Sequence, residues 1–158
     1  HAAFTSSVLE PFKKLGREIF VDIEIALSKK SKSDLDKIIP DSHNNKQSLI
    51  SLCDMYGEID IIQSAKESFS YFETTQNFMD DLEGLATKLS NKSGITLHVD
   101  LGEVQGFKYH NGVVFSAYAD SAGYVLAKGG RYDGLRKQSD RDRPAVGFDL
   151  DLVSVSNL

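Results

Sequence analysis

The stretch VVFSAYADSAGYVLAKGGRYDGL, residues 113–135, decides the fold class because it has the pattern of two antiparallel strands. Apolar runs at 113–118 and 124–127 flank the sequence Asp-Ser-Ala-Gly at 120–123, and short polar residues followed by glycine are typical of a hairpin turn. The next eight residues, KGGRYDGL at 128–135, contain three glycines. We expect a turn there, belonging to a catalytic site, to a ligand pocket or to a plain connection between strands.

More strands surround this pair, whereas the first ninety residues have a helical pattern. Alternating apolar residues between Ile95 and Leu101 predict one strand, and 145–150, after Pro144, predicts the last. The earlier part instead has apolar residues at three- and four-residue spacing. Helices followed by an antiparallel sheet indicate an α+β domain.

The helical part divides into several segments. Ser33 followed by Asp36 predicts a capped helix start, and Pro40 predicts its end. A further helix is expected from about 47 to 56, with Gly57 ending it. Pro11 either precedes the first regular helix or lies in its first turn. The remaining helical faces consist of Val8, Leu9, Phe12, Leu15, Ile19, Ile23 and Ala26, then Ile59, Ile62, Ala65 and Phe69, and finally Phe78, Met79, Leu82, Leu85, Ala86 and Leu89.

Length, charge and cysteine content narrow the class of protein. The 158 residues fit one domain, 1–158, with a helical region at 1–92 and strands at 93–158. A net charge of −5 argues against nucleic-acid binding, although 128–143 is locally basic. No apolar run is long enough to cross a bilayer, and the N-terminal residues lack a signal-peptide pattern. Cys53, the single cysteine, is expected in the core of a cytoplasmic protein.

Signatures of catalysis are missing from the sequence. It has no P-loop, no GxGxxG fingerprint and no GxSxG elbow. The four histidines are scattered without a partner at metal-ligand spacing, and Asp80 and Asp81 fall on the polar side of a helix. We therefore predict no catalytic residue, no metal site and no cofactor.

Two segments rich in glycine and aromatic residues remain, at 104–115 and 128–135. Glycine in a sheet-forming sequence marks a bend or a place where another group approaches the backbone. Tyr109, His110, Arg131 and Tyr132 supply polar groups that could orient a small ligand. The alternative is a bent sheet with packed aromatic side chains.

Three segments carry a family resemblance. VQGFKYHNGVVF (104–115) resembles the VRGLDYYTGTVF segment of histidyl-tRNA synthetases, and KGGRYDGL resembles their second histidine-binding signature. RPAVGFDLDL (143–152) is similar to their motif 3, PAVGFAIGLERL. The resemblance implies a class II aminoacyl-tRNA synthetase-like domain, an antiparallel sheet flanked by helices, of which this chain is the C-terminal part.

The chain departs from the synthetases at the charged positions. Gln105 stands where they have a catalytic arginine, and Ser154 stands where motif 3 has an arginine that meets ATP. Asp151 replaces a motif 3 glycine and adds a negative charge beside the place of the triphosphate. Because adenylyl transfer depends on positioned positive charge, these changes predict that the chain does not activate amino acids.

This combination resembles the regulatory subunit of ATP phosphoribosyltransferase, a paralogue of histidyl-tRNA synthetase. That family reads GYHYHTGVVFAAY where this chain has GFKYHNGVVFSAY (106–118), and its LPDLYGDAEVLEEAR-type segment resembles LCDMYGEIDIIQSAK (52–66). The family implies a non-catalytic cytoplasmic subunit that binds a short-form catalytic subunit. It is required for that subunit's activity and for its feedback by histidine, in the first step of histidine biosynthesis. It also implies a homodimer within a hetero-oligomer, without membrane or nucleic acid.

The resemblance also implies a remnant histidine-binding site. The residues at the positions of that site are Gln105, Tyr109, His110, Gly129, Gly130, Arg131 and Tyr132. Two other functions stay open. One is a divergent histidyl-tRNA synthetase fragment that activates histidine with ATP, and the other is an amino-acid sensor that acts on a different protein.

Overall fold

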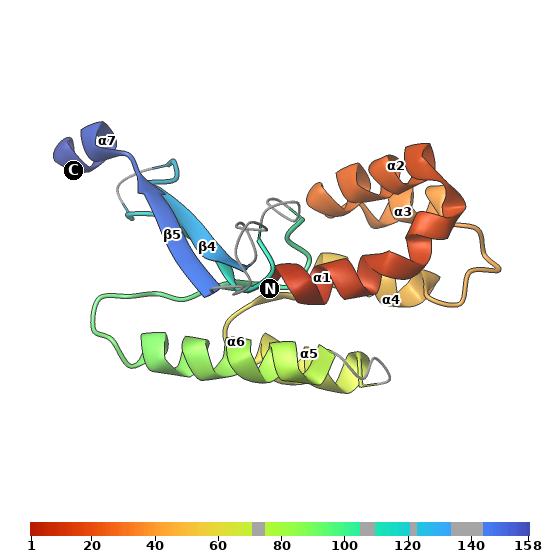
Figure 1. Cartoon of the computed structure of the whole chain (residues 1–158), viewed down its shortest axis with the longest axis horizontal. Coiled ribbons are helices and arrows are strands. Elements are labelled where there is room, and N and C mark those ends of the chain that lie inside the picture. The colour runs from red at the N-terminus through yellow and green to blue at the C-terminus, as the bar shows by residue number, and fades with distance from the viewer. Residues whose placement is uncertain (71–74, 105–109, 121–122, 134–143) are drawn as a thin grey trace, which may run out of the picture. The chain divides into compact units, whose positions relative to one another are not determined.

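The computed structural model describes residues 1–70, 75–104, 110–120, 123–133 and 144–158 (Figure 1). Contacts between residues divide the chain into two units, residues 3–105 with His1 and residues 106–158 with Ala2. The prediction of one domain over 1–158 therefore stays a prediction. In the part of the chain that the structure describes, none of the helices has the length and apolar character needed to cross a bilayer.

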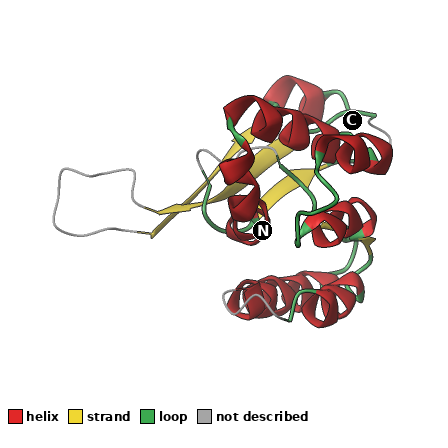
Figure 2. Cartoon of the chain, turned by 90° about the vertical axis from the view of Figure 1, so that its right-hand side faces the viewer, coloured by secondary structure: helices red, strands yellow, loops and turns green. Residues whose placement is uncertain are grey.

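The first unit is mainly helical, and Figure 2 draws the helices of the chain as red ribbons. It begins with α1 (Ala2–Leu9), the 3₁₀ helix η1 (Glu10–Leu15) and α2 (Arg17–Ser28). Pro11 lies in the first turn of η1, where its missing N–H breaks no helical hydrogen bond. Gly16, with φ 103°, makes the corner between η1 and α2, a conformation that glycine adopts without steric cost. The single helical face expected from Val8 to Ala26 is therefore spread over three helices.

The next helices are α3 (Lys32–Ile38), α4 (Lys46–Ser51) and the 3₁₀ helix η2 (Leu52–Asp54). The predicted cap at Ser33 is wrong by two positions, because Ser31 Oγ accepts the hydrogen bond from the Asp34 N–H. Helix α3 ends before Pro40, as predicted. The helix expected at 47–56 ends earlier, because β1 (Tyr56–Gly57) pairs antiparallel with β2 (Val99–Asp100). This long-range pairing overrides the local helical pattern.

Helices α5 (Ile61–Ser68) and α6 (Thr75–Ser90) confirm the two predictions made from their apolar spacing. Lys66 of α5 lies 2.7 Å from an Asp80 carboxylate oxygen and 2.6 Å from a Glu83 carboxylate oxygen of α6. Asp80 is exposed, as expected for the polar side of this helix. The ion pairs join the two helices at the edge of their apolar contact.

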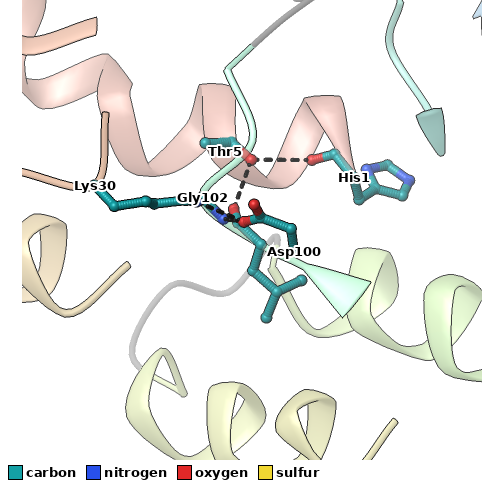
Figure 3. A network of polar contacts seen from close by, with 6 residues as sticks. His1, Thr5, Lys30, Asp100 and Gly102 are labelled. Atoms are coloured by element: carbon teal, nitrogen blue, oxygen red, sulfur yellow. Dashed lines mark hydrogen bonds and ion pairs between the residues drawn. The ribbon is translucent and has the colours of Figure 1, made fainter. Parts of the chain in front are cut away.

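The core of the first unit collects large apolar side chains from all of its helices. Its largest fully buried members are Phe4, Leu9, Phe12, Ile23, Leu27, Leu35, Ile39, Leu49, Leu52, Ile62, Phe69 and Met79. Polar contacts fix the segment around β2 to these helices (Figure 3). The Thr5 hydroxyl of α1 donates to the Leu101 carbonyl at 2.9 Å, which satisfies a buried backbone acceptor.

The second unit contains an antiparallel sheet of β3 (Val114–Ala117), β4 (Ala127–Asp133) and β5 (Pro144–Leu150), in the order β3-β4-β5. The last strand is confirmed, and the strand expected at 113–118 is confirmed as β3. Its partner was expected at 124–127, and this is wrong for the first three residues, because β4 begins only at Ala127. Figure 1 shows β4 and β5 side by side, with α7 (Leu152–Ser156) following β5. With helices first and antiparallel strands after them, the chain has the predicted α+β class.

The turn expected at 128–135 is wrong for its first six residues, because Lys128 to Asp133 belong to β4. Adjacent glycines normally weaken a strand. Here a ring fills the space beside each glycine. A methyl group on Gly129 would lie 2.7 Å from Phe115 Cε1, and one on Gly130 would lie 2.6 Å from His110 Cδ2. The strand therefore contains glycines where neighbouring rings approach its backbone closely.

Candidate functional site

The three strands of the second unit present two different faces. Every residue of β4 pairs in register with β5, so its side chains alternate between the faces without interruption. We call one the glycine face; it comprises Val114, Ser116, Lys128, Gly130, Tyr132, Ala145, Gly147 and Asp149. We call the other the phenylalanine face; it comprises Phe115, Ala117, Ala127, Gly129, Arg131, Asp133, Pro144, Val146, Phe148 and Leu150.

The glycine face brings three of the predicted site residues together. Gly130 lies directly opposite Gly147, and the His110 imidazole lies over Gly130. The rings of His110 and Tyr132 meet edge to face, with centroids 6.3 Å apart at 71°. The Tyr132 hydroxyl extends over Gly147, 3.1 Å from where a methyl group on that residue would lie. The imidazole of His110 and the phenol of Tyr132 thus lie over the backbone of Gly130 and Gly147. Both side chains have polar atoms that can form hydrogen bonds.

Arg131 and Gly129 lie on the phenylalanine face instead. Arg131 Nε donates to Asp133 Oδ1 at 3.3 Å, and the arginine stem lies close to Gly112. Phe115 and Phe148 lie on either side of Gly129. The structure therefore separates Arg131 and Gly129 from His110, Gly130 and Tyr132.

Gln105 and Tyr109, the other two predicted site residues, lie outside the described residues. The separation of Arg131 from Tyr132 follows from the alternation of side chains along a strand. Sequence reasoning missed it because KGGRYD was interpreted as a turn, in which adjacent residues can point to the same side. Two charged residues of the glycine face, Lys128 and Asp149, were also missed, since only the strand register shows that they are neighbours.

Asp151 and Ser154 are the two residues that the motif 3 resemblance aligns with a glycine and an arginine of the synthetases, and they interact with each other. The Asp151 carboxylate accepts hydrogen bonds from the Ser154 hydroxyl at 2.6 Å and from the Val153 and Ser154 N–H groups at 3.1 Å each. The bonds from Ser154 hold the pKa of Asp151 below its usual range. The two residues therefore form the N-terminal cap of α7, with an ionised carboxylate at neutral pH.

Groups able to perform chemistry are scarce in the described residues. They include no cluster of three or more His, Cys, Asp or Glu side chains that could hold a metal ion. Cys53 is buried and free, and this burial raises the pKa of its thiol. Since the thiolate is the reactive form, Cys53 is a poor nucleophile in the folded protein.

Comparisons with known proteins identify the family. The histidyl-tRNA synthetase family model matches residues 1–155. The ATP phosphoribosyltransferase regulatory subunit of Cupriavidus metallidurans is 35% identical over 120 residues, covering 76% of this chain and 30% of that protein. The subunit of the same name from Cupriavidus pinatubonensis is 31% identical over 159 residues, covering 100% of this chain and 40% of that protein. The chain thus spans well under half the length of these relatives.

A solved structure agrees with this result. A protein from Bacillus halodurans, described as an ATP phosphoribosyltransferase regulatory subunit/histidyl-tRNA synthetase, has the same fold with a TM-score of 0.67 and 24% identity. The match covers 94% of this chain and 40% of that chain. The predicted synthetase-like α+β fold is therefore confirmed. The chain belongs to the histidyl-tRNA synthetase family, and the relatives that it resembles are ATP phosphoribosyltransferase regulatory subunits.

Proposed function

We propose that the chain is part of a non-catalytic regulatory subunit of ATP phosphoribosyltransferase. It acts with a short-form catalytic subunit in the first step of histidine biosynthesis. The observation that carries this proposal is the cap formed by Asp151 and Ser154. It stands where the resembling synthetases have a glycine and an ATP-contacting arginine.

The electrostatics of this cap oppose amino-acid activation. Adenylate formation brings a triphosphate next to a carboxylate, and enzymes stabilise that charge with positioned cations. The lowered pKa of Asp151 means that it is negatively charged at neutral pH. Gln105 adds no positive charge at the position of the synthetase arginine. These substitutions support the proposal that the protein has the synthetase fold but does not catalyse adenylate formation.

The subunit's effect on its partner is allosteric in this proposal. It is required for the activity of the short-form catalytic subunit and makes that subunit sensitive to histidine. By linkage, histidine inhibits the complex only if it binds more tightly to an inactive state than to the active one. The ring-bearing glycine face, with His110 and Tyr132, is the proposed histidine-binding surface.

Activation of the catalytic subunit tests the proposal directly. The condensation of ATP with phosphoribosyl pyrophosphate is measured for a short-form catalytic subunit alone and with this protein. We expect activity only in the mixture, and inhibition of the mixture by histidine. We also expect no histidine-dependent exchange of pyrophosphate into ATP by this protein alone. Such exchange, without activation, would instead identify an enzyme that activates histidine.

The proposed complex contains a homodimer of this subunit within a hetero-oligomer, and its composition can be tested separately from its activity. Light scattering after size-exclusion chromatography gives the mass of the protein with and without the catalytic subunit. We expect a co-eluting complex of the two proteins. Copurification with an unrelated protein, and none with the catalytic subunit, would favour an amino-acid sensor that acts elsewhere.

A further inference from the structure

We propose that Lys128 and Asp149 bind the carboxylate and ammonium groups of a free α-amino acid on the glycine face. The ligand's side chain then extends toward His110 and Tyr132. This inference rests on the proposed function, because it extends the ligand site of the regulatory subunit by a pair of charged contacts.

Strand register brings the two charges together. Lys128 lies directly opposite Asp149 of β5 and directly opposite Ser116 of β3. It is two residues from Gly130 and four from Tyr132, and so it shares their face. Both charged side chains are exposed, which leaves them accessible to a ligand. One end of the glycine face thus carries the two charges, and the other carries the two rings.

The spacing along β4 fits an amino acid with a ring side chain. At the usual rise of a strand, Lys128 is about 7 Å from Gly130 along the strand axis. From ordinary bond lengths, an amino acid such as histidine measures about 6 Å from its carboxylate to the far edge of its ring. A ligand whose ring lies beside His110 above Gly130 therefore places its charged end near Lys128.

The charges match those of a free amino acid. Residues directly opposite each other in an antiparallel pair have Cβ atoms about 4.5–5.5 Å apart. The carboxylate and ammonium groups of an α-amino acid leave the same carbon atom, so they can meet Lys128 and Asp149 at the same time. A ligand with only one of these groups would leave one protein charge without its counterpart.

Arg131 is a poor candidate for this carboxylate contact. It lies on the phenylalanine face, where its side chain pairs with Asp133. The cation that β4 places on the glycine face is Lys128. The ordinary alternative is that Lys128 and Asp149 form a cross-strand pair that only stabilises the sheet, an effect of about 0.2–1 kcal/mol.

Exchanging the two charges separates these roles. The variant Lys128→Asp with Asp149→Lys keeps a cross-strand pair but places each charge where the ligand's like charge would lie. Calorimetric titrations with L-histidine are made on the protein in complex with its catalytic subunit. We expect the exchanged variant to melt near the wild-type temperature and to bind L-histidine about ten- to a hundredfold more weakly, since one charge-assisted hydrogen bond has this effect.

Single variants and a second ligand identify each contact. Histamine has the ammonium and the ring of histidine but no carboxylate. We expect Lys128→Met to weaken binding of L-histidine and to leave that of histamine unchanged. Asp149→Asn should weaken both. The matched control, Arg131→Met on the opposite face of the same strand, should leave both affinities unchanged.

Two results would overturn the inference. Wild-type affinity in both Lys128→Met and the exchanged variant would assign the pair to sheet stability alone. Absence of L-histidine binding by the wild-type complex would also reject it. The first result leaves the proposed function untouched. The second would also contradict its feedback by histidine, whereas activation of the catalytic subunit is measured in a separate assay without histidine and stands or falls independently.

Discussion

Lys30 Nζ lies 2.6 Å from Asp100 Oδ1 and joins the end of α2 to β2 across 70 positions of the sequence (Figure 3). The same carboxylate oxygen accepts the Gly102 N–H at 2.8 Å. Lys30 has φ 53°, in the left-handed region that residues other than glycine, asparagine and aspartate rarely adopt. The backbone around Lys30 is therefore held in an uncommon conformation from which its ammonium group reaches Asp100.

Removing this pair should destabilise the first unit. We expect Lys30→Met to lower the free energy of unfolding by about 1 kcal/mol, because both charges are only partly screened by water. Asp100→Ala should cost more than Asp100→Asn, since the asparagine amide oxygen can still accept the Gly102 N–H. Chemical denaturation of the single variants and of Lys30→Met with Asp100→Asn measures the coupling. Additive effects of the two changes would show that the pair contributes nothing.

Replacing Gly102 and Gly84 by alanine should change the stability of the protein in opposite directions. A methyl group on Gly102 would lie 2.6 Å from Lys30 Nζ and 2.7 Å from the Leu52 carbonyl oxygen, which cannot move freely. We expect Gly102→Ala to destabilise the protein by about 1–3 kcal/mol. Gly84 lies inside α6 with open space around it, so Gly84→Ala should stabilise by about 0.5–1 kcal/mol. Thermal melts of both variants show whether the two shifts have opposite signs.

The sequence predicts well those elements that its local pattern determines. Helix α6 follows from apolar spacing, and Pro40 marks the end of α3. Prediction failed for the helix expected to continue to Tyr56, because this residue pairs instead with Asp100, more than forty positions away. It also failed at Gly129 and Gly130, where rings from other segments determine the local structure. Such contacts depend on the completed fold and have no signature in the local sequence.

The candidate site shows the same limit. Sequence resemblance picked out His110, Gly130 and Tyr132, which the structure places on one face. It also picked out Arg131, which the structure places on the other. A motif identifies which residues belong to a site in the family. To assign each of these residues to a face, one must also know that the motif forms a strand and how that strand pairs with its neighbours.

Alanine at Gly129 and alanine at Gly130, its neighbour in β4, should lower the stability of the protein by different amounts. A methyl group on Gly129 would lie 2.5 Å from the Gly147 carbonyl oxygen, an atom of the neighbouring strand's backbone. On Gly130 it would meet the His110 ring, which can rotate away, and would lie 3.0 Å from the Val113 carbonyl oxygen, a less severe backbone contact. We therefore expect Gly129→Ala to destabilise by about 1–3 kcal/mol and Gly130→Ala by less. Urea denaturation compares them, and equal losses would contradict the difference in their surroundings.

The cap of α7 should depend on pH. The hydroxyl and N–H groups of Ser154 lower the pKa of Asp151, so the ionised carboxylate is favoured in the folded state. Its stabilising effect is complete above the unfolded pKa of about 3.9 and is lost as the pH falls through the lower folded pKa. Amide exchange at Val153 and Ser154 reports the cap. We expect Asp151→Ala to speed exchange at neutral pH and Asp151→Asn to preserve protection, since an asparagine side chain also accepts these bonds.

Cys53 should make the folded protein less stable at alkaline pH. The residue is 2% exposed, and desolvation raises the pKa of its thiol, so the folded state favours the neutral form. Stability from this group is fully present below the unfolded pKa of about 8.5 and is lost as the pH rises toward the folded value. We expect the free energy of unfolding to fall between pH 8 and 10 more steeply in the wild type than in Cys53→Ala, which has no thiol. A disulfide reagent should modify Cys53 far more slowly in buffer than in guanidinium. Equal slopes in the two proteins, or rapid modification of the native one, would place the thiol in contact with water.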